Sequence, residues 1–163
     1  MEFKPPQNLA TRSRNKKTVF LGGSIEMGKA KNWQKDATEF FESLTGWDIF
    51  NPRRDDWDSS WEQSFDNPQF FQQVVWEHTA LELADLIIIC FEGGTMSPIS
   101  LLELGLFAKT GKIRVVCPKE FWRKGNVDIV CSFYDIPLYT HIDVLLFDLA
   151  QSEEIKQKKD TSL

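Results

Sequence analysis

The residues from Asp85 to Phe91 read DLIIICF, and this apolar run constrains the fold more than any other part of the sequence. A helix needs about 20 apolar residues to cross a bilayer, so this run is too short to do so. It has the length of a strand, and the lack of alternating polar residues predicts burial on both faces. Such a strand is typical of a parallel sheet that is covered by helices on either side.

Strand-like and helix-like segments alternate along the rest of the chain. We expect strands at Thr18 to Leu21, Trp47 to Phe50, Asp85 to Phe91, Ile113 to Cys117 and Pro137 to Tyr139. We expect helices at Lys29 to Leu44, Pro68 to Leu83, Ile99 to Thr110, Val127 to Phe133 and Ile142 to Ala150. The order predicts one three-layer α/β domain of the flavodoxin or Rossmann type, with an about five-stranded parallel sheet and helices on both faces. The domain should span residues 17–151, between a flexible polar arm at 1–16 and a polar tail at 152–163.

Composition excludes several classes of function. The net charge is -5, and without a basic stripe the chain is a poor candidate for binding polymeric nucleic acid. The two histidines have no metal-ligand partners nearby in the sequence, so we expect no metal site. The three cysteines lack C-x-x-C spacing, which favours buried free thiols in a reducing cytoplasm. The polar N-terminal segment does not have the pattern of a signal peptide.

Three loops are the candidate ligand sites, because ligands bind beyond the carboxyl ends of the strands in such sheets. They span Gly22 to Gly28, Asn51 to Trp61 and Glu92 to Ser100. The second loop is long for a plain connection, which makes Asn51 and Trp57 candidate substrate-binding residues. The alternative is that its tryptophans pack onto the core, and the sequence leaves both interpretations open.

The first loop fits most of a phosphate-binding pattern. From Gly23 it reads GSIEMGKA, against G-x-x-x-x-G-K-[ST] for a P-loop. The last position is Ala30, which has no hydroxyl for Mg²⁺, and Glu26 places a negative charge where phosphates would lie. A P-loop kinase is therefore the weaker hypothesis, and a glycine turn that serves another ligand is the stronger one.

Two glutamates are candidate catalytic residues. Glu103 lies in SPISLLELG, a predicted helix start that is otherwise apolar, and a buried charge there needs a partner. Glu77 lies in VVWEHTALELAD, on the helix that leads into the apolar strand, with Glu82 as its competitor. Each of these residues also has an ordinary interpretation as a solvated carboxylate on the surface of a helix, since glutamate is mostly exposed.

Several motifs in sequence order resemble one enzyme family. FLGGSI, NPRR, a W-E helix that ends in AD, the apolar strand and SPISLLELG together resemble the nucleoside 2-deoxyribosyltransferases and their relatives that hydrolyse 2'-deoxynucleoside 5'-monophosphates. The resemblance covers about Val19 to Tyr139. It implies that the glycine turn binds a sugar rather than a nucleotide phosphate chain.

The resemblance also assigns roles to single residues. Glu103 matches the family's nucleophile, and Glu77 matches an acidic residue, usually Asp, that contacts the sugar. Ser97 matches a serine or acid six residues before the nucleophile, and Gly23 and Ser24 match the Gly-Ser pair of the first loop.

Two further positions extend the comparison with the family. Asn126 in GNVD matches an asparagine that family members take from a neighbouring subunit, which implies a homo-oligomer with shared active sites. The family usually carries a tyrosine in the first strand, close to the nucleophile, and Phe20 stands at that position without the hydroxyl.

The sequence therefore predicts a cofactor-free enzyme that cleaves the N-glycosidic bond of a small nucleoside or nucleotide. Transfer of the sugar to a free base through a covalent intermediate on Glu103 is the leading hypothesis. Hydrolysis, with water as the acceptor, is its nearest alternative. A P-loop kinase and a non-catalytic nucleotide sensor on the same fold are weaker alternatives.

Overall fold

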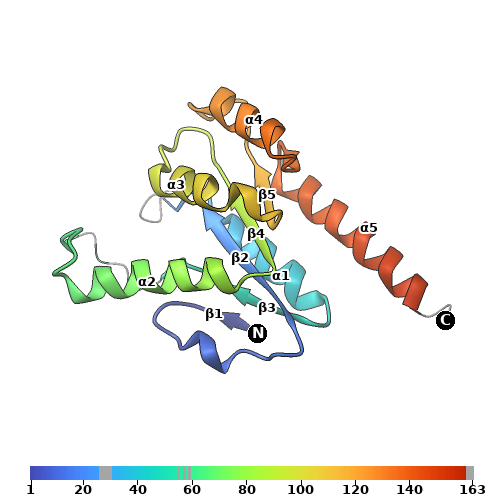
Figure 1. The fold of residues 1–163 in the computed structure, drawn as a ribbon, viewed down its shortest axis with the longest axis horizontal. Coiled ribbons are helices and arrows are strands. Elements are labelled where there is room, and N and C mark those ends of the chain that lie inside the picture. The colour runs from blue at the N-terminus through green and yellow to red at the C-terminus, as the bar shows by residue number, and fades with distance from the viewer. Residues whose placement is uncertain (26–30, 55, 57, 59, 161–163) are drawn as a thin grey trace.

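The computed structural model describes residues 1–25, 31–54, 56, 58 and 60–160 of the chain. Six parallel strands form one sheet in the order β1-β3-β2-β4-β5-β6 (Figure 1). The strands are β1 (Glu2–Phe3), β2 (Lys17–Gly23), β3 (Trp47–Phe50), β4 (Leu86–Cys90), β5 (Ile113–Val116) and β6 (Leu138–Tyr139). The α/β class and the parallel sheet that the sequence predicts are confirmed.

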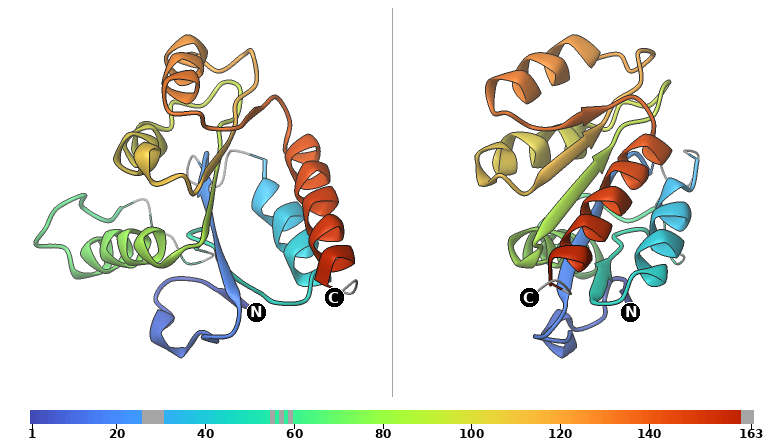
Figure 2. Two further views of the ribbon diagram at one scale, coloured as in Figure 1. Left: turned by 45° about the vertical axis from the view of Figure 1, so that its right-hand side comes forward. Right: turned by 90° about the vertical axis from the view of Figure 1, so that its right-hand side faces the viewer.

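Helices cover both faces of the sheet (Figure 2). One face carries α2 (Pro68–Leu83), α3 (Pro98–Phe107) and α4 (Lys124–Phe133). The other carries α1 (Trp33–Ser43) and α5 (Ile142–Asp160). Short 3₁₀ turns lie at Leu9–Thr11 and Ala108–Thr110. All five residues of β4 are buried, as the apolar run predicts, because each face of this strand meets a helical layer.

The strand order places a topological switch point between β2 and β4. After β2 the chain crosses to β3 on one side of β2, and it later returns to form β4 on the other side. The register pairs Gly22 with Ile89 and Gly23 with Cys90, so both strands end together at their carboxyl edge. A crevice at such a point is where ligands bind in open α/β sheets.

Residues 1–16 differ from the predicted flexible arm. Phe3 is buried, and β1 adds a sixth strand beside β3, with the Asn51 N–H donating to the Phe3 carbonyl at 2.9 Å. Leu9 is buried in the same core cluster as Phe3. A two-residue strand is too short to show a periodic pattern, which is why the sequence gives no sign of it.

Several helix boundaries also differ from the predictions. Helix α1 begins at Trp33 rather than Lys29; Lys31 and Asn32 are not helical, and Lys29 lies outside the described residues. Helix α5 continues to Asp160, past the predicted end at Ala150. The extension is polar and has no apolar face to mark it, but it is rich in good helix formers such as Glu, Gln and Lys. No helix in the described part of the chain is long and apolar enough to cross a membrane.

Candidate active site

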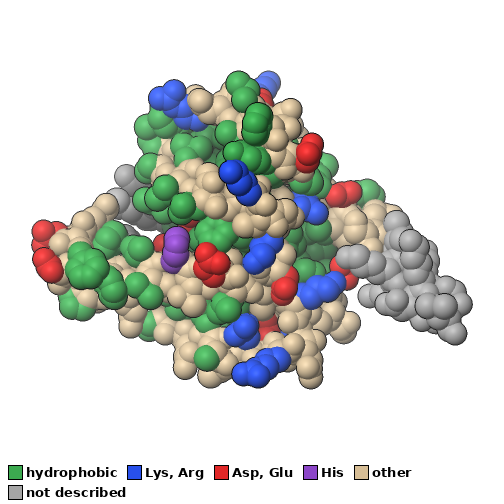
Figure 3. Space-filling model, in the orientation of Figure 1, with side chains coloured by type: hydrophobic (Ala, Val, Ile, Leu, Met, Phe, Trp, Pro, Cys, Tyr) green, Lys and Arg blue, Asp and Glu red, His purple; other side chains and the backbone are tan. Residues whose placement is uncertain are grey.

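A cavity of about 500 Å³ lies at the switch point. Its walls come from the end of β2, from α2 and from α3, so it occupies the crevice that the strand order predicts. Apolar side chains line much of it, including Phe70, Val74, Ile99, Leu102 and Leu106. In the space-filling view, hydrophobic side chains gather over α2, α3 and α4 on the visible face (Figure 3). Two carboxyl groups, those of Glu77 and Glu103, also line this largely apolar cavity.

Glu103 lies on α3 with only 8% of its surface exposed. A Cβ atom on Gly22 would lie 3.4 Å from Glu103 Oε2 and 2.8 Å from Cε1 of Phe20, so the Glu103 carboxylate lies close to the end of β2. Burial, and then the nearby charge of Glu77, raise the pKa of Glu103 to about 8. Glu103 is therefore a buried carboxyl group that is mostly protonated at neutral pH until a ligand or neighbour changes its surroundings.

Glu77 lines the same cavity from α2. The start of this helix is well capped. The Asn67 side chain accepts hydrogen bonds from the N–H groups of Gln69 and Phe70, and Pro68 occupies the first helical position. Burial raises the pKa of Glu77 to about 7, although a hydrogen bond from Gln73 lowers it in part. The structure thus brings together the two glutamates that the sequence singled out, while their competitor Glu82 is exposed.

A hydroxyl cluster, formed by Ser24, Thr95 and Ser97, adjoins the cavity. The Oγ of Ser24 lies 2.6 Å from the Oγ of Ser97 and 2.8 Å from Oγ1 of Thr95, and Thr95 Oγ1 lies 3.0 Å from Ser97 Oγ. The Glu92 N–H donates to Ser24 Oγ at 3.0 Å, and Thr95 Oγ1 donates to the Glu92 carbonyl at 2.8 Å. Ser97 lines the cavity, so the cluster gives it a polar wall.

The backbone that carries this cluster is held in an unusual conformation. Ser97 has φ 45° and ψ 50°, a left-handed conformation that is uncommon for residues other than glycine. Gly23 has φ 139°, and a Cβ there would lie 2.1 Å from the Cys90 carbonyl oxygen. The close contact allows the Ser24 N–H to donate to that carbonyl at 2.8 Å. Only glycine fits at position 23, and this fit fixes Ser24 against Ser97.

Comparison with known proteins identifies the family of this chain. Residues 16–121 match the model of a family described as nucleoside 2-deoxyribosyltransferase like. The chain belongs to this family. A conserved protein from Enterococcus faecalis V583 has a similar solved structure, with a TM-score of 0.59 and 10% identity over 84% of this chain and 99% of that one. At that identity the likeness shows the fold alone. No curated protein matches the sequence.

Other predicted site residues of this deoxyribosyltransferase-like chain lie away from the cavity. The Asn51 amide is engaged within the fold: Nδ2 donates to Glu2 Oε1 at 2.7 Å, and Oδ1 accepts the Arg53 N–H at 3.0 Å. Its neighbour Pro52 lines the cavity instead. Asn126 is exposed on α4 and does not line it. Trp57 lies outside the described residues, as does the 26–30 segment of the P-loop-like pattern.

Sequence reasoning missed several residues of the site. Gln73 is buried and hydrogen-bonds Glu77, and Thr95 completes the hydroxyl cluster. The signal for Gln73 was available, because it precedes Glu77 by one helical turn and therefore lies on the same face. Gly22 was noted only as part of a turn, and its contact with Glu103 joins residues far apart in the sequence.

Proposed function

We propose that the protein cleaves the N-glycosidic bond of a 2'-deoxynucleoside and transfers the sugar to another base. One observation carries the proposal: two glutamates from different helices, the half-buried Glu77 and the buried Glu103, line one cavity at the switch point of the sheet. Family membership supports the reaction class. The hydroxyl cluster offers partners for the sugar hydroxyls, and the apolar walls offer a surface for the flat base.

The proposed reaction has two displacement steps. In the first, an oxygen of ionised Glu103 bonds to the anomeric carbon while the carbon–nitrogen bond breaks, and its electron pair leaves with the base. In the second, a nitrogen of the incoming base attacks the same carbon and releases the Glu103 carboxylate. Because each step inverts the anomeric carbon, the overall transfer retains its configuration.

Glu77 is proposed to handle the protons of both bases. A leaving base is a poor anion, so a proton on its nitrogen lowers the barrier. The reactive form of the pair has one proton, held by Glu77, and leaves Glu103 ionised. Glu77, with a pKa raised to about 7, donates this proton to the leaving base in the first step and takes one from the incoming base in the second. No cofactor or metal is needed in this scheme, because both steps use only carboxyl groups of the chain.

Product analysis tests the proposal directly. The protein is incubated with each 2'-deoxynucleoside and each 2'-deoxynucleoside 5'-monophosphate, with and without a second free base. A new nucleoside, formed only when the second base is present, is the expected result. Free sugar in both arms would instead establish hydrolysis. No cleavage of any substrate by well-folded protein would overturn the proposal, and retention of the ligand unchanged would favour a sensor.

We also propose that the protein works as a homo-oligomer with shared sites. Asn126 is exposed on α4, and three exposed apolar side chains lie near it in the sequence, namely Trp122 just before this helix and Ile129 and Phe133 on it. Such a surface has the composition of an interface core. In this arrangement Asn126 reaches the cavity of a neighbouring subunit, which would explain why it does not line its own. A closed two-fold pair is the expected minimum.

Subunit exchange tests the shared site. Glu103→Gln protein and Asn126→Ala protein, each inactive, are mixed under conditions that exchange subunits, and hybrids are verified by mass spectrometry. Partial return of activity is expected, because some hybrids hold one complete site. A mixture that contains hybrids and stays inactive would contradict the proposal, as would a monomer in light scattering at micromolar concentration.

We also propose that the protein is located in the cytoplasm. The cysteines Cys90, Cys117 and Cys131 are all free and buried. Free thiols are usual in the reducing conditions of the cytoplasm. Fractionation of cells that make a tagged protein would test this.

A further inference from the structure

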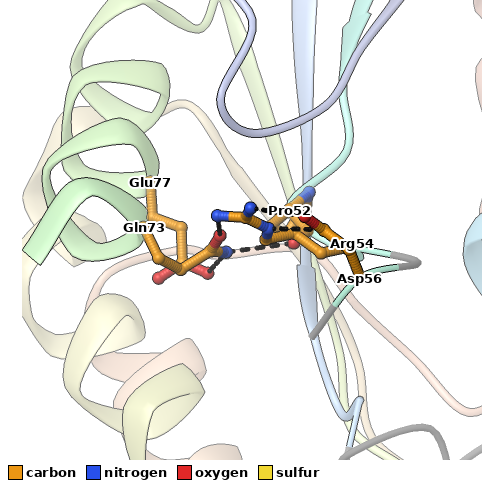
Figure 4. Close-up of polar contacts among 5 residues, drawn as sticks. All are labelled: Pro52, Arg54, Asp56, Gln73 and Glu77. Carbon is orange, nitrogen blue, oxygen red and sulfur yellow. Dashed lines mark hydrogen bonds and ion pairs between the residues drawn. The ribbon is translucent and has the colours of Figure 1, made fainter. Parts of the chain in front are cut away.

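The amide of Gln73 connects the candidate acid Glu77 to the loop that follows β3 (Figure 4). Gln73 is only 4% exposed. Its Nε2 donates to Glu77 Oε1 at 2.8 Å and to the Pro52 carbonyl at 3.1 Å, which uses both amide hydrogens. Its Oε1 accepts from Arg54 Nη1 at 3.5 Å. Every polar atom of this side chain is therefore engaged.

These contacts allow only one orientation of the amide. If the Gln73 amide were flipped, its oxygen would face the Glu77 carboxylate and the Pro52 carbonyl, both of which are acceptors. Its nitrogen would then face the Arg54 guanidinium, which is only a donor. Arg54 therefore opposes the flip, and it keeps the Gln73 N–H groups directed at Glu77.

Arg54 is itself fixed by the loop. Its side chain is only 5% exposed, while Asp56, which balances its charge, is 69% exposed. Arg54 Nε donates to Asp56 Oδ1 and Nη2 donates to Asp56 Oδ2, each at 2.8 Å. The guanidinium also lies over the Trp61 ring, 5.0 Å from its centre. Hydrogen bonds thus run from Asp56 through Arg54 and Gln73 to Glu77.

We propose that Gln73 is the positioning residue for Glu77, held in its working orientation by Arg54. This inference rests on the proposed function and assigns residues to it that the family resemblance does not name. The Gln73 hydrogen bond holds Oε1 of Glu77, while Oε2 has no hydrogen-bond partner among the described residues. A protonated carboxyl accepts hydrogen bonds better at its carbonyl oxygen than at its hydroxyl oxygen. The proton of Glu77 therefore stays on Oε2, where a base in the cavity can take it.

The same contact favours the ionised form of Glu77. The titratable groups that line the cavity with Glu77 are Glu103 from α3 and His78 from its own helix, and Arg54 is linked to Glu77 only through Gln73. The Gln73 hydrogen bond lowers the pKa of Glu77 against the effect of burial. Its removal should therefore make Glu77 titrate at higher pH.

Three variants separate positioning from a merely structural role. Gln73→Met keeps the volume and removes both donors. Arg54→Met leaves the amide in place but removes the group that opposes its flip. Gln72→Met is the matched control, because Gln72 is the neighbouring residue on α2 and is exposed.

The readouts are the Glu77 titration and steady-state kinetics. The carboxyl carbon of Glu77, assigned with a Glu77→Gln protein, is followed by NMR against pH. We expect Gln73→Met to raise its midpoint by about one pH unit, Arg54→Met to raise it by less, and Gln72→Met to leave it unchanged. With a deoxynucleoside substrate, Gln73→Met should lower kcat by ~10-fold and leave KM nearly unchanged.

The two readouts fail in different ways. If the wild-type protein cleaves no nucleoside, the proposed reaction is wrong, while the NMR titration still decides whether Gln73 governs Glu77. If Gln73→Met does not fold, Arg54→Met decides the question, because it changes a different residue. A Glu77 midpoint that is the same in wild type, in Arg54→Met and in any folded Gln73 variant would overturn the inference.

Discussion

The hydroxyl cluster and Glu103 adjoin the same cavity, but their polar groups are satisfied to opposite degrees. Ser24, Thr95 and Ser97 bond to one another and to the backbone of residue 92, so each hydroxyl has its partners before any ligand arrives. Glu103 has no hydrogen-bond partner among the described residues, and its carboxyl group is buried against Gly22.

The difference indicates that the two groups have different roles, one in binding and one in catalysis. A satisfied hydroxyl cluster is stable without ligand and can exchange one bond for a contact with a sugar. A buried carboxyl without hydrogen-bond partners is poorly stabilised when it is ionised. Such a carboxylate interacts strongly with the positive charge that develops on the anomeric carbon in the transition state. The proposed mechanism therefore places ground-state binding at the hydroxyl cluster and the chemistry at the glutamate pair.

The largest expected effect concerns the nucleophile. Glu103→Gln should fold normally and lose at least ~10³-fold in turnover, because an amide cannot form the covalent glycosyl intermediate. Steady-state kinetics measures the loss, and Glu82→Gln is the control, since Glu82 is an exposed carboxylate on α2. A folded Glu103→Gln protein with near-normal turnover would show that Glu103 is not the nucleophile.

The second effect tests the coupling within the glutamate pair. Glu77→Gln should lower kcat by ~10²-fold, the scale of a lost acid–base group. It should also move the pH dependence, because the charge of Glu77 helps to raise the pKa of Glu103 to about 8. Without that charge Glu103 ionises more easily, so the rising limb of kcat/KM should shift to lower pH. A limb that stays in place would mean that the two carboxyls do not interact.

The third effect concerns the hydroxyl cluster. Ser97→Gly removes the hydroxyl that lines the cavity, while glycine adopts the φ of 45° at this position without strain. We expect KM to rise by ~10-fold with kcat almost unchanged, since the lost contact is made equally in the ground and transition states. Ser132→Ala, on the exposed side of α4, is the control. A fall in kcat instead would give Ser97 a part in the chemistry and weaken the contrast.

The sequence predicts the glutamate pair better than its surroundings. Glu103 stands out because it interrupts an apolar helix, and Glu77 because it lies on the helix that precedes the buried strand. The buried strand β4 can also be predicted from the sequence. Strand β1 and the Arg54–Gln73 contact cannot be predicted in this way, because each depends on residues that meet only in the folded chain. Asn51 shows the opposite case: it follows a strand, as ligand-binding residues do, yet Glu2 and Arg53 occupy its amide.

The smallest expected effect is on stability, and it needs no substrate. An unfolded glutamate has a pKa of about 4.3, whereas burial raises that of Glu103 to about 8. Between these values the unfolded chain has released a proton that the folded protein retains, so the contribution of Glu103 falls as pH rises from about 4.3 through 8. Gln at this position cannot ionise, and any cost of burying its amide is the same at every pH.

We therefore compare the melting temperatures of Glu103→Gln and wild type at several pH values. We expect this difference to shift in favour of Glu103→Gln by at least about 1 kcal/mol, or ~2–4 °C, between pH 4 and pH 8. Glu82→Gln should show no such trend, because Glu82 is exposed in the folded protein. A difference that is constant with pH would mean that Glu103 ionises as easily in the folded as in the unfolded chain. Ionisation of Glu103 would then cost no extra free energy in the folded protein, which would contradict the proposed difference between Glu103 and the hydroxyl cluster.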